Sequence, residues 1–366
     1  MSWLSRSKVN QWPVLASAFL AAVSAFADNA PPVRVDINAG HPKKLSEYNF
    51  FVGNLYDHKP NEGVVPYDIN TPLFSDYTAK HRFVWMPPGT SAQYDPDEAF
   101  SFPVGAVFIK SFGYLRDMRD PSKGEDILET RLLVHKADGW VGLPYVWNAD
   151  KSDADLKVAG GEVHAEWTHS DGSKRSNNYI LPNMNQCKGC HDVSGAIVPI
   201  GPKARHLNKS FAYNGGTANQ LAHWTKIGYL TGAPNPKEAP RLPVWDDPVT
   251  GTVAERARAY LDANCMHCHN PKGPANTSGL DLRYSQTDSR QWGVMKPPVA
   301  AGRGAGDNLF DIVPGKPDES ILIFRLDSTD PGIMMPELPR RLVHDEGVAL
   351  LREWIASMAS LEQSSD

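Results

Sequence analysis

The sequence predicts an α+β multidomain protein in which an N-terminal antiparallel β-sandwich is followed by two mainly α units. Three observations indicate this class. The first half of the chain carries alternating strand patterns with Asp-Gly turns, the second half carries amphipathic helix patterns, and all four cysteines lie in the second half. A chain of 366 residues corresponds to roughly two or three domains of ordinary size.

Residues 1–27 have the features of a secretory signal peptide. Arg6 and Lys8 precede the apolar run Val14–Ala27, which ends in a small-x-small cleavage site. The run is shorter than the roughly 20 residues that a membrane-spanning helix needs. We therefore expect a periplasmic protein with no stable membrane insertion after cleavage; the alternative is an uncleaved N-terminal anchor.

The composition bears on possible partners. The formal net charge is −5 and no basic run occurs, which argues against nucleic acids as partners. Proline contributes 30 residues, more than the usual share of about 5%. This excess favours a chain rich in loops.

Residues 28–180 form the predicted β-rich domain. Glu162–Thr168 alternates between apolar and polar side chains, as a strand with one buried face does. Phe102–Phe112 is predicted to be another strand. Asp-Gly pairs at 138–139 and 171–172 are typical of tight hairpin turns.

Helices are predicted beyond residue 180. Thr252 and Glu255 have the spacing of a capping box, which predicts the start of a helix that runs towards the second cysteine cluster. Asp345 can cap a last helix, and an earlier helix is predicted to end at Gly228.

All four cysteines belong to two copies of the pattern Cys-x-x-Cys-His. The copies are Cys187, Cys190 and His191, and Cys265, Cys268 and His269. At helical spacing the two thiols can each form a thioether with a haem vinyl group, and the adjoining imidazole can bind the iron. We therefore expect two covalently attached haem c groups, one in a first c-type haem unit at 181–243 and one in a cytochrome c-like domain at 244–366.

Other uses of paired cysteines fit the sequence less well. A structural zinc site pairs its two Cys-x-x-Cys knuckles within about 15–20 residues, whereas 74 residues separate Cys190 from Cys265. Zinc would also leave both trailing histidines unexplained. A thioredoxin-like redox pair lacks its βαβ context, and helical spacing disfavours a disulfide within either pair.

The second axial ligands are predicted separately for the two haems. Met335, in a Pro-rich loop before the last helix, is the first choice for the C-terminal haem, and Met334 is the second; methionine ligation raises the reduction potential. For the first haem the candidates are His223 and His206, and an open iron is the third possibility.

Several segments together resemble a known family. They are "GVVPYDINTPLFSDYTAKHRFVWMPPG", "FPVGAVFIKSF", "ETRLLVH" with "GWVGLPYVWN", "NQCKGCH" with "GPKARHLN", and "NQLAHW". With these segments the chain resembles a family of secreted two-haem c-type cytochromes of unassigned physiological role. The resemblance implies haem binding, electron transfer, an N-terminal β domain and a periplasmic setting.

The predicted function is electron transfer between periplasmic redox proteins, through two haems in series. The acidic chain suits transient docking to basic carriers. The alternative is a dihaem, peroxidase-like enzyme with one open iron, in which Arg205 or His206 could act as acid–base groups; a haem-bearing sensor or assembly subunit is a third class. We expect the polar stretch 75–83, with Asp76, Lys80, His81 and Arg82, to be a solvated surface rather than a cover for a haem edge or a ligand site.

Overall fold

The computed structural model describes residues 30–299, 301–338 and 340–359, so the predicted signal peptide lies outside the described residues. The chain divides into a unit that ends at Pro31 and a second unit of residues 32–366. The second unit contains both cysteine motifs. No helix among the described residues is long and apolar enough to cross a membrane.

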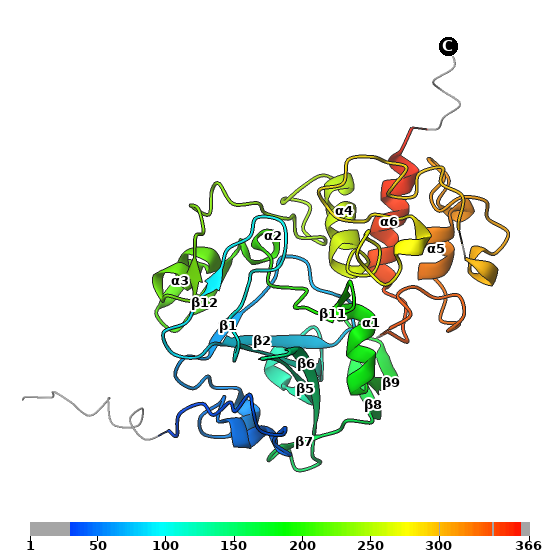
Figure 1. Cartoon of the computed structure of the whole chain (residues 1–366). Coiled ribbons are helices and arrows are strands. Elements are labelled where there is room, and N and C mark those ends of the chain that lie inside the picture. Colours follow the sequence, from blue (N-terminus) through cyan, green and yellow to red (C-terminus); the bar gives the residue numbers. More distant parts are fainter. Residues whose placement is uncertain (1–29, 300, 339, 360–366) are drawn as a thin grey trace, which may run out of the picture. The chain divides into compact units, whose positions relative to one another are not determined.

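A six-stranded antiparallel sheet lies at the centre of the second unit, with the strand order β1-β2-β4-β5-β6-β7 (Figure 1). Its strands are β1 Val65–Tyr67, β2 Ala79–Trp85, β4 Val107–Leu115, β5 Glu125–Lys136, β6 Gly139–Trp147 and β7 Ala154–Leu156. The predicted Asp-Gly turn joins β5 to β6, and Gly139 adopts a φ of 122° there, which favours glycine.

The other strands form pairs outside this sheet. They are β8 Gly161–Thr168 with β9 Lys174–Leu181, β10 Asp192–Val193 with β11 Ala196–Ile197, β12 Ser210–Tyr213 with β13 Gly216–Asn219, and β3 Ala92–Gln93 with β14 Leu230–Thr231. The β8–β9 hairpin has the alternating pattern that the sequence predicts, with Ala165 and Trp167 buried. It packs on Phe112 and Tyr114 of β4.

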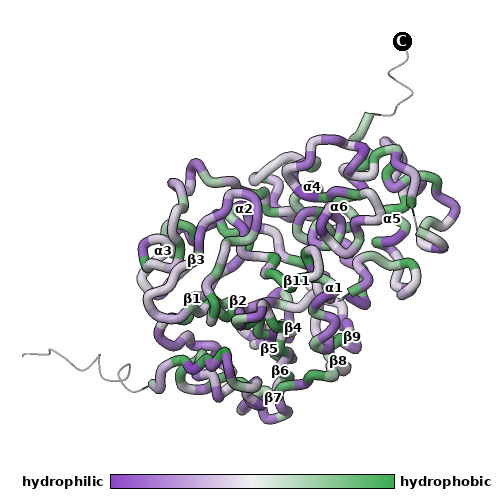
Figure 2. Tube along the Cα trace, in the orientation of Figure 1, coloured by the Kyte–Doolittle hydropathy of each residue, from purple (hydrophilic) through white to green (hydrophobic). Residues whose placement is uncertain are grey.

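The two faces of the large sheet are covered differently. One face packs on the N-terminal segment around Leu45 and Phe50, and this core includes Ile109 of β4. The other face packs through Phe108 on residues from the second half of the chain, among them Trp224. Figure 2 shows apolar residues along the central strands and polar residues along the surrounding loops.

Six helices are found among the described residues, and all are short. They are α1 Cys187–His191, α2 Ala204–Leu207, α3 Gln220–Lys226, α4 Val253–Asn264, α5 Ile321–Leu326 and α6 Asp345–Ser357. The predicted capping box at Thr252 is confirmed, and α3 is followed by Gly228 with a φ of 78°. Asp345 is the first residue of α6 rather than its cap, which is His344.

The predicted fold class is wrong in two respects. The β region is one six-stranded sheet with an added hairpin, not a sandwich of two sheets. Residues 181–243 do not form a mainly α haem unit, because α1, α2 and α3 have only five, four and seven residues. The reason is that the apolar residues of this segment, such as Leu207 and Trp224, share one core with apolar residues of the large sheet, such as Phe108. Strand therefore outweighs helix across the described residues, so the second half of the chain does not divide into two mainly α haem units.

Candidate functional site

The first cysteine motif is a single helical turn beside the sheet. Asn183 caps the short η4 turn (Met184–Gln186) that leads into α1. Within α1, the Nδ1 atom of His191 lies 2.7 Å from the carbonyl oxygen of Val198. An Nδ1–H that donates to this carbonyl fixes the tautomer and leaves Nε2 available to a metal ion.

The second motif has the same local chemistry at the end of α4. The amide nitrogen of His269 donates to the carbonyl of Cys265 at 2.9 Å, which forms one helical turn across the motif. The Nδ1 atom of His269 lies 3.0 Å from the hydroxyl oxygen of Ser278. Each motif therefore presents an imidazole whose Nδ1 is held and whose Nε2 has no hydrogen bond among the described residues.

The two motifs are in direct contact, although 74 residues separate Cys190 from Cys265 in the sequence. The Sγ atom of Cys268 lies 3.4 Å from the carbonyl oxygen of Gly189, which belongs to the first motif. The loops that follow the motifs also meet, because Ser194 N donates to the carbonyl of Lys272 at 3.1 Å. All four cysteines are free thiols.

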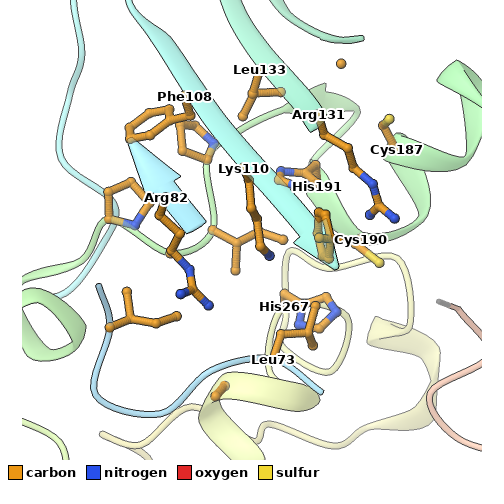
Figure 3. Close-up of a pocket in the computed structure, with 18 of the residues that line it drawn as sticks. Leu73, Arg82, Phe108, Lys110, Arg131, Leu133, Cys187, Cys190, His191 and His267 are labelled. Atoms are coloured by element: carbon orange, nitrogen blue, oxygen red, sulfur yellow. The ribbon is translucent and has the colours of Figure 1, made fainter. Parts of the chain in front are cut away.

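A cavity adjoins the first motif (Figure 3). It encloses about 1390 Å³ that no protein atom fills, part of it open to solvent. Its wall combines the first motif, one face of the sheet and the turn of the second motif. The residues from these three sources are Cys187, Cys190 and His191, then Arg82, Lys110 and Arg131, then Met266 and His267.

Three cations lie side by side on the sheet face of this cavity. Arg82, Lys110 and Arg131 are cross-strand neighbours in register on β2, β4 and β5. Like charges in such positions repel each other, and burial adds a desolvation cost. A ligand with negative charge in the cavity would offset both costs.

The pairing of these cations is incomplete. Arg82 donates to Asp68 at 2.8 Å, but its Nη2 is buried without a partner among the described residues. Arg131 is paired with the buried Glu129. Lys110 has neither a hydrogen bond nor an ion pair among the described residues, and its Nζ lies 4.8 Å from the centre of the Phe112 ring. Burial, followed by the neighbouring Arg82, lowers the pKa of Lys110 well below its usual value.

Burial also sets the protonation of the motif side chains. It lowers the pKa of His191 and of His269 to about 4, so both imidazoles are neutral at pH 7. It raises the pKa of the Cys265 and Cys268 thiols to about 12. Neutral imidazoles are the form that binds metal ions.

A buried ionic network links the surroundings of the two motifs. Asp262 of α4 accepts two hydrogen bonds from Arg205 of α2, at 3.1 and 3.0 Å. It also lies 3.0 Å from Nε2 of His206 and accepts from the amide nitrogen of Tyr284 at 2.9 Å. These contacts hold the pKa of Asp262 well below its usual range despite its complete burial. His206 is thereby tied to α4.

The structure separates the two histidines proposed as ligands of the first haem. His206 borders the cavity, with 4% of its surface exposed and its Nδ1 unpartnered. His223 borders none of the described cavities and stacks on Tyr213, with the ring centres 3.6 Å apart. The structure therefore does not bring His223 to the first motif.

The methionines predicted for the second motif lie in one loop between α5 and α6. Met334 is 6% exposed and Met335 is half-buried. Arg340 holds this loop, because its Nε donates to the carbonyl of Met335 at 3.0 Å. The choice between the two sulfur atoms stays a prediction.

The polar stretch 75–83 is only partly exposed: Asp76 and Arg82 are buried, whereas Lys80 and His81 are half-buried, so the expectation of a solvated surface is wrong for Asp76 and Arg82. Asp76 accepts hydrogen bonds from the amide nitrogens of Arg341 and Leu342, at 2.8 to 3.0 Å, and from Asn177 at 2.9 Å. Arg82 lines the cavity. The stretch was misjudged because its partners come from distant parts of the sequence.

No group of three or more His, Cys, Asp or Glu side chains able to hold a metal ion is found among the described residues. Comparisons with protein-family models, with curated proteins and with solved structures find no match. The site itself combines two pairs of thiols, two imidazoles and a partly apolar cavity that is lined by Lys110, which has no ionic partner among the described residues, and by the unpartnered Nη2 of Arg82. This combination suits a flat apolar ring that carries carboxylates and a metal ion.

Proposed function

We propose that this chain is an exported, periplasmic dihaem c-type cytochrome that transfers electrons between redox partner proteins. The observation that carries the proposal is the contact between two Cys-x-x-Cys-His motifs, each with its histidine Nδ1 held by a hydrogen bond. Bound haem iron supplies reversible one-electron oxidation and reduction.

The residues around the first motif fit such a group. Cys187 and Cys190 would hold the ring and His191 would bind the metal. The unpaired Lys110 and the free Nη2 of Arg82 would donate hydrogen bonds to the carboxylates of the ring. These buried polar groups would then no longer lack partners. Apolar groups such as Phe108 and Leu133 would cover the ring itself.

The contact between the motifs supports transfer within one chain. Covalent attachment at Cys268 and at the first motif would hold two haems close to each other, because the Sγ atom of Cys268 contacts the carbonyl oxygen of Gly189. An electron could then pass from one group to the other without release from the protein. The chain would thus work as a two-step relay between a donor and an acceptor.

A peroxidase-like dihaem enzyme is the second candidate. The observation that favours it is that the cavity beside the first motif is partly open to solvent and is bordered by His206. Space beside the first motif could therefore admit a small substrate. His206, tied to Asp262, would be its acid–base group.

The test is to purify the exported protein and measure haem by intact mass and by the pyridine haemochrome assay. Two covalent haems per chain are expected, together with rapid reduction and reoxidation by small periplasmic electron carriers. The absence of covalent haem contradicts the proposal. Turnover with peroxide, combined with a high-spin iron in the oxidised protein, favours the enzyme instead.

A further inference from the structure

His267 lies between the two cysteines of the second motif, yet its ring faces the first. Its side chain lines the cavity that Cys190 and His191 border, and also a second cavity beside Cys190. Figure 3 shows His191, Cys190 and His267 grouped at one side of the first cavity. A residue from the second attachment turn therefore belongs to the surroundings of the first.

This imidazole is buried without a partner. Only 6% of the His267 surface is exposed, and neither ring nitrogen makes a hydrogen bond among the described residues. Leaving a buried polar group unsatisfied costs about 1–3 kcal/mol. By contrast, His191 and His269 both have a hydrogen bond at Nδ1. The atom recorded as buried without a partner is Nδ1, and Nε2, which makes no hydrogen bond among the described residues, is left free to bind a metal ion.

We propose that His267 would be the second protein ligand of the iron of a haem held at the first motif, in addition to His191. The inference rests on the proposed function, because it requires a haem at the first motif. It replaces the alternatives of an open iron and of ligation by His206 or His223.

The competing side chains are engaged elsewhere. The Nε2 atom of His206 is paired with Asp262 at 3.0 Å, which leaves only Nδ1, the nitrogen next to the ring's attachment point and the harder one to bring to a porphyrin iron. Lys110 belongs to a row of cations and matches a carboxylate better than an iron. His223 stacks on Tyr213.

The proposal assigns a direction to electron flow. Two imidazoles at the first haem give a lower reduction potential than methionine and histidine at the second, because methionine ligation raises the potential. Electrons would enter at the first haem and leave from the second. The second motif would then hold one haem by its cysteines and ligate the other through His267.

The test uses spin-resonance and near-infrared spectra of the oxidised holoprotein. One bis-imidazole haem per chain is expected in the native protein, and its signal should be replaced by high-spin iron in His267→Ala and restored by added imidazole. In His267→Met the thioether absorption per chain should double, because a second methionine-ligated haem joins the first. The matched control is His223→Ala, which should leave both spectra unchanged.

Several outcomes would overturn this proposal alone. They are a high-spin first haem in the native protein, an unchanged bis-imidazole signal in His267→Ala, and loss of that signal in His206→Gln. Each of them leaves the two-haem stoichiometry intact. A native protein without covalent haem would instead remove the proposed function together with this inference.

Discussion

The first cysteine motif is built against a β-sheet, whereas the second lies at the end of a twelve-residue helix that packs on α6. Both motifs form one helical turn, and both hold Nδ1 of their histidine with an acceptor a few residues further along the chain. The residues that surround the two motifs differ in kind, because the first motif faces a sheet and the second follows a helix. Five residues therefore form the same helical turn in both places, while the cover over a group attached there would depend on the rest of the chain.

The electrostatic settings differ as well. The first motif faces three cations in register, and Lys110 among them has no ionic partner within the described residues. The apolar core beside the second motif consists of residues such as Leu261, Ile323 and Trp354. A charged wall favours an anionic edge of a ligand, and an apolar wall favours the face of a ring.

The largest expected effect is the loss of one haem per chain when the cysteines of either motif are replaced. Cys265→Ser combined with Cys268→Ser should leave one covalent haem per chain, and so should Cys187→Ser combined with Cys190→Ser, because each pair of thiols holds one group. Intact mass measures the result. Unchanged mass in either double variant would contradict the assignment of that motif.

Met335→Ala tests the ligand that distinguishes the second haem. Loss of the sulfur ligand should abolish the thioether absorption of the oxidised protein and lower the potential of that haem. Met334→Ala is the matched control and should keep the absorption, although truncating this buried side chain costs about 2–5 kcal/mol of stability. Survival of the absorption in Met335→Ala would assign the ligand to Met334 or to another residue.

Asp262→Asn tests the connection between the two surroundings. The variant leaves Arg205 and His206 buried without their carboxylate, which should lower the free energy of unfolding by about 3–5 kcal/mol. Urea unfolding measures the loss. Asp318→Asn, which removes an exposed pair with Arg352, is the control and should change little. Equal effects of the two variants would argue against a structural role for the network.

The pH dependence of stability compares one buried histidine from each region. Burial, followed by the neighbouring His81, lowers the pKa of His58 in the β region to about 4, and burial lowers that of His344 beside α6 to about 4. An unfolded histidine titrates near pH 6.5, so between pH 6.5 and 4 the unfolded chain binds more protons.

Stability is therefore fully present above about pH 6.5 and falls as the pH is lowered towards 4, by up to ~3 kcal/mol per histidine. Unfolding of His58→Phe and of His344→Phe at pH 7 and pH 4.5 should show a smaller acid loss than the native protein. An unchanged pH dependence in one variant would show that its histidine is not buried as neutral imidazole.

The smallest effect is expected from Gly142→Ala. A Cβ atom at this position of β6 would lie 2.6 Å from the Sγ atom of Cys187, so the thiol would be displaced. Haem content at the first motif should fall in part, while the second motif stays fully loaded. Gly215→Ala, where a Cβ atom meets nothing within 4 Å, is the control. Full haem content at both motifs would show that the Cys187 side chain can move away from the new Cβ atom.

Local features of the fold could be predicted because their causes are local. The capping box at Thr252, the hairpin turn at 138–139 and the alternation in Glu162–Thr168 each depend on neighbours in the sequence. The sandwich and the first α unit could not be predicted in this way. Whether Leu207 and Trp224 cover a helix or a sheet depends on which apolar surface reaches them.

The candidate site shows the same division. The cysteines and histidines of both motifs can be identified in the sequence, because the Cys-x-x-Cys-His spacing is typical of haem attachment. From the sequence, His223 was the first-named candidate ligand for the first haem, and His267 was not named. Nothing in the neighbouring residues indicates that a histidine inside one Cys-x-x-Cys-His motif faces the other motif. The pairing of Arg82 with Lys110 depends on the register between β2 and β4, which the sequence of one strand does not predict.

The amino-acid sequence by itself indicated the two Cys-x-x-Cys-His motifs, the helix that starts at Thr252, the hairpin turn at 138–139, and the predicted export signal. Tertiary structure alone decided that the two turns touch, that three cations share one cavity wall, and that His267 faces the first motif. The physical reason is that spacing along the chain specifies only hydrogen bonds and faces within one element. Contacts across 74 residues arise when separate apolar surfaces are buried together.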